Sequence, residues 1–206
     1  MALNGQAGPP REVRIIGGQW KRSKLPVPKQ GAVRPTTDRI RETVFNWLGQ
    51  DLSGWRCLDA FAGSGALGFE AASRGAREVL LLELDARQAA SLEASRLRLK
   101  GSMLRVQRAD ALAWMRRAAR DRFDLVFLDP PFDSELLAPS LAAALPLVVP
   151  GGFIYLESST PLSEVPADRA DLTDWAVWRQ SRAGLVHFQL WRRGYTAAAE
   201  PRSSAT

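Results

Sequence analysis

The fold is decided by residues 56–68, which read RCLDAFAGSGALG. We predict that a short apolar strand over 56–61 enters a glycine turn, and that the alanine-rich residues 67–73 form a helix after it. Gly63 and Gly65 permit backbone conformations that a Cβ atom would forbid, so the chain can approach a ligand closely there. In an open α/β sheet, such a turn lies beyond the carboxyl ends of the strands, where ligands bind.

The alternation of strand and helix continues toward the C-terminus, where apolar runs are separated by amphipathic stretches and turn residues. We predict an α/β fold with a mostly parallel, Rossmann-like, seven-stranded sheet, helices on both faces and a C-terminal antiparallel hairpin. The further strands are expected at 79–84, 104–107, 123–128 and 153–157, the helices at 86–100, 111–119 and 136–145, and the hairpin at 175–182 and 185–192.

Two kinds of ligand compete for the glycine turn. Gly63, Gly65 and Gly68 have the spacing of a dinucleotide site, where a pyrophosphate rests on a helix N-terminus. Asp59, however, ends the strand just before these glycines. Its carboxylate would repel a pyrophosphate but could accept a hydrogen bond from an ammonium group. S-adenosylmethionine carries an ammonium group and no phosphate, so Asp59 favours this cofactor over a dinucleotide; an ordinary tight turn capped by an aspartate is the bland alternative.

Acidic residues also follow the next two predicted strands. Glu83 ends the second strand, and an acid at that position can bind both hydroxyls of a ribose; Asp85 is the alternative. Asp110, followed by Ala111, comes after the third strand and could accept from an adenine amino group, or serve as a helix N-cap, or do both. Three acids after three successive strands fit a nucleoside with a charged tail.

The most specific signal is the tetrad Asp129, Pro130, Pro131 and Phe132 at the end of the fourth strand. Two prolines fix two φ angles and make the turn rigid. The Asp129 carboxylate and the Pro130 carbonyl are then two acceptors in fixed relation, which would satisfy both N–H bonds of a planar amine. Phe132 offers an aromatic face to a base flipped out of its stack.

These acceptors suit methylation of an exocyclic amine on a nucleobase. The nitrogen lone pair is delocalised into the ring, and two acceptors favour the pyramidal geometry that frees it. Positioning and electrostatics would supply most of the rate. Asp129 could also receive the departing proton, directly or through water.

Charge is concentrated near the N-terminus. The chain has a net charge of +6, while residues 11–41 alone contain nine Lys or Arg and two acids, a net +7. A concentrated basic segment favours a polyanionic partner, because each phosphate contact releases counterions. The alternative is a flexible, solvated N-terminal segment that binds no partner.

Four segments are predicted: a disordered N-terminus (1–12), a basic RNA-binding arm with a helix (13–50), a catalytic domain (51–194) and a flexible tail (195–206). Within the arm, residues 14–16 could form a short strand, and the prolines that follow it predict an irregular connection. The helix of the arm should begin near Thr37 or Asp38 and end at Gly49. Trp20 is expected to pack in a core rather than stack on a base.

Several features are absent from the sequence. No apolar run reaches the roughly 18–20 residues of a membrane span, and we find no secretory signal or metal-ligand spacing. Cys57 is the only cysteine, so no intrachain disulfide forms; it is expected to be a buried small hydrophobe, and His187 to be structural. We expect a cytoplasmic protein.

The chain resembles the bacterial small-subunit ribosomal RNA guanine-N2 methyltransferases. The resemblance covers about Arg14 to Arg193 and rests on RIIGGQW at 14–20, RPTTDRIRET at 34–43, FNWL at 45–48, the glycine loop at 59–68 and the tetrad at 129–132. It implies a class I fold that depends on S-adenosylmethionine. It further implies transfer of one methyl group to a guanine N2 amine of 16S rRNA in the assembling 30S subunit. We expect the protein to be a monomer.

The resemblance also assigns roles to residues. It implies cofactor binding by Asp59, Ala62, Gly63, Ser64, Gly65 and Glu83, with weaker support for Asp110 and Ala111, and catalysis by Asp129, Pro130, Pro131 and Phe132. Glu157 lies at a position that is usually acidic in the family. Beside the cofactor cleft, RNA backbone contacts are expected from Arg14, Lys21, Arg22, Lys24, Arg34, Thr37, Arg39 and Arg41.

Three other functions compete with this one. A DNA adenine-N6 methyltransferase can use a similar tetrad, but such enzymes usually add a target-reading domain, for which 206 residues leave no length. A protein-amide methyltransferase would more often have Asn in place of Asp129. A non-catalytic RNA-binding assembly factor would be free to lose Asp129 and the glycine turn.

Overall fold

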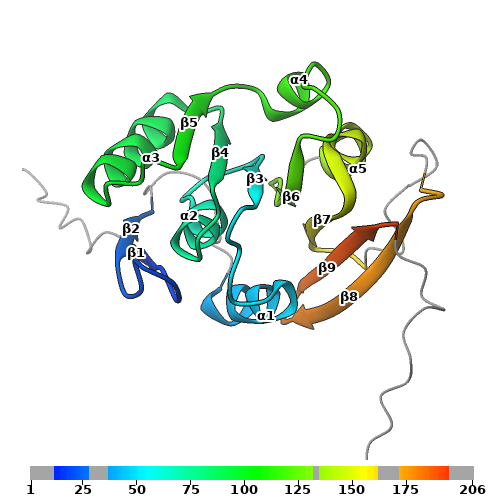
Figure 1. Ribbon diagram of the computed structural model, residues 1–206, viewed down its shortest axis with the longest axis horizontal. Coiled ribbons are helices and arrows are strands. Elements are labelled where there is room, and N and C mark those ends of the chain that lie inside the picture. Colours follow the sequence, from blue (N-terminus) through cyan, green and yellow to red (C-terminus); the bar gives the residue numbers. More distant parts are fainter. Residues whose placement is uncertain (1–11, 28–36, 132–134, 162–171, 195–206) are drawn as a thin grey trace, which may run out of the picture.

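The computed structural model describes residues 12–27, 37–131, 135–161 and 172–194. Its main sheet has seven strands in the order β5-β4-β3-β6-β7-β9-β8 (Figure 1). Strands β3 to β7 are parallel, β9 is antiparallel to β7, and β8 is antiparallel to β9. The strands are β3 (Arg56–Asp59), β4 (Glu78–Glu83), β5 (Leu104–Arg108), β6 (Phe123–Leu128), β7 (Val148–Ser158), β8 (Trp175–Ala183) and β9 (Val186–Arg193). The predicted mostly parallel sheet with a closing hairpin is confirmed.

Helices cover both faces of this sheet. The helices are α1 (Asp38–Leu48), α2 (Ala66–Ser73), α3 (Ala86–Arg98), α4 (Ala111–Met115), α5 (Leu137–Ala144) and the 3₁₀ turn η1 (Leu145–Leu147). Alternate residues of the strands point to opposite faces. Cys57 packs in one core with residues of α1, α2 and α3, and its neighbour Leu58 packs in the other with residues of α4 and α5.

The predicted helix and strand bounds hold to within a few residues along most of the chain. Thr37 caps α1, since its hydroxyl accepts from the Ile40 amide, and Gly49 ends that helix with φ of 87°. The clearest differences are α4, which ends at Met115 rather than 119, and β7, which begins at Val148 rather than 153.

The basic segment contains a hairpin that the sequence did not reveal. We expected one short strand at 14–16 and an irregular connection rich in proline after it. Instead β1 (Glu12–Arg14) pairs with β2 (Lys24–Pro26) in an antiparallel two-stranded sheet. Pro26 is tolerated because it ends an edge strand. Beyond this hairpin pairing, the Ile16 amide donates to the Glu70 carboxylate at 2.8 Å.

This hairpin shares the core of the catalytic domain. Ile15 and Leu25 are buried in the same cluster as Phe69 of α2 and Cys57 of β3. Trp20 packs on Phe69, with ring centroids 6.3 Å apart, as expected of a core tryptophan. Residues 13–50 and 51–194 are therefore not separately packed units. The predicted disordered N-terminus, apart from Glu12, and the predicted tail lie outside the described residues. No described helix has the length and apolar character of a membrane span.

Candidate active site

The loop after β3 is held in a tight turn at the carboxyl edge of the sheet. The Gly65 amide donates to the Ala62 carbonyl at 2.6 Å, and Gly65 itself is left-handed with φ of 77°. A Cβ at Gly65 would come within 2.7 Å of both Leu92 and Phe69. Glycine is therefore required at this position by conformation and by space, and α2 begins directly after it.

Asp59 lies beneath this loop, at the end of β3. Its side chain is 2% exposed, and it accepts a 2.9 Å hydrogen bond from the Gly68 amide in the first turn of α2. Burial raises the pKa of Asp59 to about 7, although the Gly68 bond acts in the opposite direction. A carboxyl group with this pKa gains from a cationic neighbour, which suits the predicted ammonium partner.

Glu83 joins the ends of β3 and β4. One carboxylate oxygen accepts from the Gly63 amide at 2.9 Å, and the other accepts from the Asp85 amide at 2.8 Å. Each oxygen keeps a second lone pair for a ligand hydroxyl. Asp85 instead caps α3, where its carboxylate accepts from the Arg87 and Gln88 amides. Because Asp85 is used as a helix cap and Glu83 keeps free lone pairs, Glu83 is favoured over Asp85 as the ribose ligand.

Asp110 has the helix-capping role that was one of its two predicted alternatives. Its carboxylate accepts from the Ala113 amide at 2.7 Å at the start of α4, and its side chain is otherwise exposed. Ala111, the first residue of α4, is buried against the sheet. The second carboxylate oxygen of Asp110 is available to a ligand, so the cap does not exclude an adenine contact.

The proline turn follows β6, which neighbours β3 in the sheet. Leu128 is the last residue of the strand, Pro130 is buried, and Pro131 is exposed. Phe132 lies outside the described residues. Because the parallel strands end at the same edge of the sheet, Asp129 of the proline turn lies at the same edge as Asp59 and Glu83. The structure thus brings together the predicted cofactor acids and the predicted acceptor pair.

Tyr155 is a further residue of this edge that sequence reasoning missed. It lies on β7, and its hydroxyl donates to the Glu157 carboxylate at 2.6 Å; both side chains are buried. The pKa of Tyr155 is held well above its ordinary value, mainly by burial. The charge and hydrogen bond of Glu157 and then the charge of Asp129 raise it further. Tyr155 therefore stays a donor, and it orients Glu157 near the proline turn. Their i, i+2 spacing on one strand face was the available signal.

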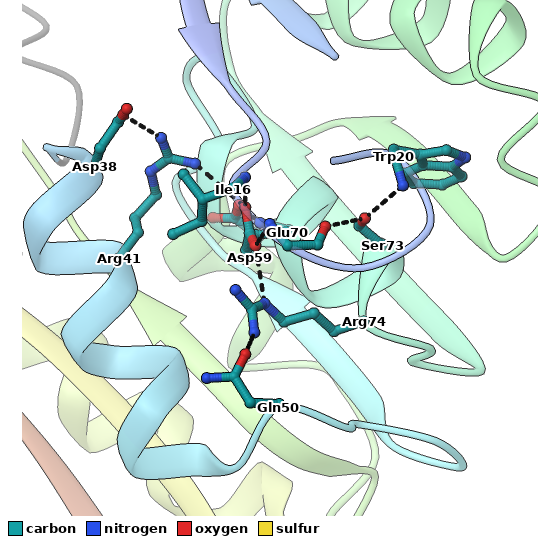
Figure 2. Close-up of polar contacts among 11 residues, drawn as sticks. Ile16, Trp20, Asp38, Arg41, Gln50, Asp59, Glu70, Ser73 and Arg74 are labelled. Carbon is teal, nitrogen blue, oxygen red and sulfur yellow. Dashed lines mark hydrogen bonds and ion pairs between the residues drawn. The ribbon is translucent and has the colours of Figure 1, made fainter. Parts of the chain in front are cut away.

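Arg41 is not an RNA contact, and that prediction is wrong. Its guanidinium is fully buried, bonding Asp38 at 2.6 Å and Glu70 at 3.4 Å (Figure 2). Glu70, also fully buried on α2, further accepts from Arg74 and from the Ile16 and Gly17 amides, each at 2.8 Å. This ion-pair cluster joins the N-terminal segment, α1 and α2 behind the glycine turn.

The other basic residues are spread over more than one part of the surface. Arg39 is exposed on the first turn of α1, beside its cap Thr37, and Arg34 lies outside the described residues. Arg14 and Lys24 face each other across the hairpin, where Lys24 pairs with Glu12 at 2.6 Å. RNA contact by these residues stays a prediction.

Lys21 and Arg22 do not flank the cofactor loop as expected. Their turn contacts Ser73 at the far end of α2, where the Trp20 amide donates to the Ser73 hydroxyl at 2.9 Å (Figure 2). A Cβ at Gly18, which is left-handed at φ of 69°, would overlap the Ser73 carbonyl. Ser73 is the last residue of the eight-residue helix α2, so this contact lies about one helix length, or about 12 Å, from the cofactor loop.

Cys57 and His187, which were expected to be structural, both lie within strands of the sheet. Cys57 is buried in β3, and burial raises the pKa of its thiol, which disfavours a nucleophilic thiolate. His187 lies on β9, paired in register with Ser158 and Arg182. Within the described ranges, no group of three His, Cys, Asp or Glu side chains could hold a metal ion.

Comparisons with known proteins agree with this geometry. A family model described as conserved hypothetical protein 95 matches residues 13–192. Ribosomal RNA small subunit methyltransferase D of Escherichia coli K12 is 40% identical over 190 residues, covering 88% of this chain and 90% of that protein. The Haemophilus influenzae protein of the same name is 38% identical over 186 residues, covering 88% and 94%. A solved structure of the E. coli putative methyltransferase yhhF superposes with a TM-score of 0.76 at 36% identity, covering 89% and 98%.

Proposed function

The chain belongs to the family described as conserved hypothetical protein 95, and from this we propose that it methylates 16S rRNA. The methyl donor is S-adenosylmethionine, and the acceptor is the exocyclic N2 amine of a guanine in the assembling 30S subunit. The relatives' shared name, ribosomal RNA small subunit methyltransferase D, supports the class of RNA. The observation that carries the chemistry is the position of the Asp129 corner at the same sheet edge as Asp59 and Glu83.

The cofactor fits the residues of this edge. Glu83 would bind the ribose hydroxyls, Asp59 the ammonium group, and Asp110 the adenine amine, while Ala62, Gly63, Ser64 and Gly65 allow close approach of the backbone. When bound, S-adenosylmethionine would supply an electrophilic methyl group for transfer to the amine nitrogen.

The protein's own part in the reaction is to position the amine and accept its proton. The Asp129 carboxylate and the Pro130 carbonyl would each accept one N–H of the guanine amine. This arrangement turns the nitrogen lone pair away from the purine ring, and Pro131 keeps the corner rigid. One proton must leave as the new N–C bond forms, and Asp129 is the nearest base in the proposed arrangement. Phe132 would stack on the flipped base.

The remaining parts of the proposal concern the setting of the reaction. We propose a monomer that works in the cytoplasm, where bacterial subunits assemble. Exposed basic residues of the N-terminal segment would hold RNA phosphates, without reading the sequence. Recognition of one guanine then depends on the shape of the particle.

A direct experiment separates this function from its competitors. The protein is incubated with S-adenosylmethionine labelled in the methyl group and one of three acceptors: immature small subunits, duplex DNA or a protein extract. Label in N2-methylguanine of the first acceptor alone is the expected result. Label in N6-methyladenine of DNA would establish the alternative that the tetrad also fits, and no label in any acceptor would favour a non-catalytic assembly factor.

A further inference from the structure

Two segments far apart in sequence meet at the end of the molecule opposite the active site. One is the turn between β1 and β2, and the other is the end of α3. The Arg98 guanidinium donates to the Lys24 carbonyl at 2.5 Å, and the Trp20 ring lies against Gly101. We call this region the hairpin–α3 surface and define it by Lys21, Arg22, Arg98 and Lys100.

The charges of this surface are not neutralised locally. All four residues are exposed, and within the described part of the chain none has an acidic partner within ion-pair distance. Nearby cations differ, since Lys24 pairs with Glu12 and Arg96 pairs with Glu93, each at 2.6 Å. Four cations without an ion-pair partner among the described residues, in the hairpin turn and at the end of α3, attract a polyanion. A solvated N-terminal segment therefore does not fully account for this charge.

Backbone conformation supports a role beyond solubility. Arg22 has φ of 73° and Lys100 has φ of 54°, and only one other described non-glycine residue, Asp121, has positive φ. A left-handed conformation is unfavourable for a residue with a side chain, whereas glycine adopts it freely. Each of the two turns holds a basic side chain in a conformation that glycine would adopt without strain, which indicates a function for the side chain.

The helix dipole explains only part of this pattern. Basic residues in the last turn of a helix are favourable, and Arg96 and Arg98 occupy that turn of α3. Arg22 and Lys21 belong to no helix, and Lys100 lies beyond the helix end. The dipole therefore accounts for Arg98 but leaves the other three unexplained.

We propose that the hairpin–α3 surface binds the phosphate backbone of the rRNA at a site remote from the target guanine. This inference rests on the proposed function. Helix α3 begins near Glu83 and runs 13 residues away from it, or about 20 Å. A contact at its end reaches a different part of the RNA from the flipped base, and it would help the enzyme to recognise the folded particle.

Glycine substitutions at Arg22 and Lys100 test whether this surface binds RNA, because they remove the charge and the backbone strain together. We expect Arg22→Gly with Lys100→Gly to leave thermal stability equal or higher. Binding to small subunits from cells that lack the protein should weaken, and the slope of log K against log salt should become shallower by about 2. A purely structural role predicts no loss of binding.

The matched comparison removes the same charge elsewhere. Arg22→Gln with Lys100→Gln is compared with Arg116→Gln with Arg117→Gln, which changes two exposed arginines after α4 on the other face of the sheet. Only the first pair should weaken binding. Equal effects of the two pairs, or no effect of either, would overturn the inference. Wild-type methylation of the same particles is measured in parallel, so its absence would mark a failure of the proposed function instead.

Discussion

The Glu83 carboxylate at the end of β4 accepts a 2.9 Å hydrogen bond from the Gly63 amide in the loop after β3. This bond, with the second from Asp85, fixes the orientation of the carboxylate before any ligand arrives. A preoriented acceptor loses less entropy when a ribose binds. Glu83 is therefore the residue whose removal should most directly report on cofactor affinity.

Replacing Glu83 with Ala should weaken S-adenosylmethionine binding by about 10- to 100-fold, the range expected when charged hydrogen bonds are lost. Isothermal titration calorimetry measures the dissociation constant. Asp85→Ala is the control, because Asp85 caps α3; it should cost about 1 kcal/mol of stability and leave the dissociation constant nearly unchanged. A larger loss of affinity from Asp85→Ala would assign the ribose to that residue instead.

Replacing Asp129 with Ala should lower kcat by a factor of about 100 to 1,000, as when one positioned polar group is removed from an active site. Cofactor affinity should stay within about twofold of the wild type, because Asp129 is proposed to hold the amine and not the cofactor. Single-turnover methyl transfer together with calorimetry checks both statements. Near-normal transfer by this variant would refute the proposed role of the proline corner.

Asp59 should make stability depend on pH. Its pKa of about 7 in the folded protein lies above its ordinary value of 3.8. The folded state therefore binds more protons than the unfolded state between these values, so this group lowers the free energy of unfolding as pH rises from about 4 to about 7. Denaturant titrations across this range should show the fall in the wild type and a weaker fall in Asp59→Asn.

The same group should link cofactor binding to proton release. A bound ammonium group stabilises ionised Asp59, so binding below pH 7 should release a proton and affinity should rise with pH up to about 7. Calorimetry in two buffers with different ionisation enthalpies counts the protons. A count that is the same in wild type and Asp59→Asn would contradict the assignment.

Replacing Glu70 with Ala should destabilise the protein by about 3–5 kcal/mol, because Arg41 and Arg74 would be left as buried charges. Asp38→Ala is the matched control, since it removes the other carboxylate that pairs with Arg41. Asp38 is 61% exposed, so its loss should cost about 0–1 kcal/mol. Similar effects of the two changes on urea unfolding would show that the buried pairs are not the source of stability.

Local sequence patterns were sufficient to predict most of the fold. Glycine and proline mark the ends of elements such as α1 and β6, and parallel strands bring their carboxyl ends to one edge. That rule predicts that Asp59, Glu83 and Asp129 lie at the same edge of the sheet. The acids of the site are thus predictable, because their positions follow from strand ends alone.

The role of Arg41 was not predictable in the same way. Its partner Glu70 lies 29 residues away on a helix that otherwise contains small and apolar residues, and a charged residue next to other cations looks like part of a basic surface. Burial depends on which helix face meets which neighbour, a tertiary property that composition does not report. For the same reason, the count of charged residues identified the basic segment in the sequence but could not predict that its hairpin turn packs at the far end of α2.

The core shared by Ile15, Leu25 and Phe69 has a consequence for how the protein is made and handled. During synthesis, residues 12–27 emerge from the ribosome before their packing partners on α2, so this segment completes its folding only after later segments emerge. A truncated version that lacks this segment would lose part of its interior along with its cations. Surface substitutions, not deletions, are therefore the proper means to separate RNA affinity from folding.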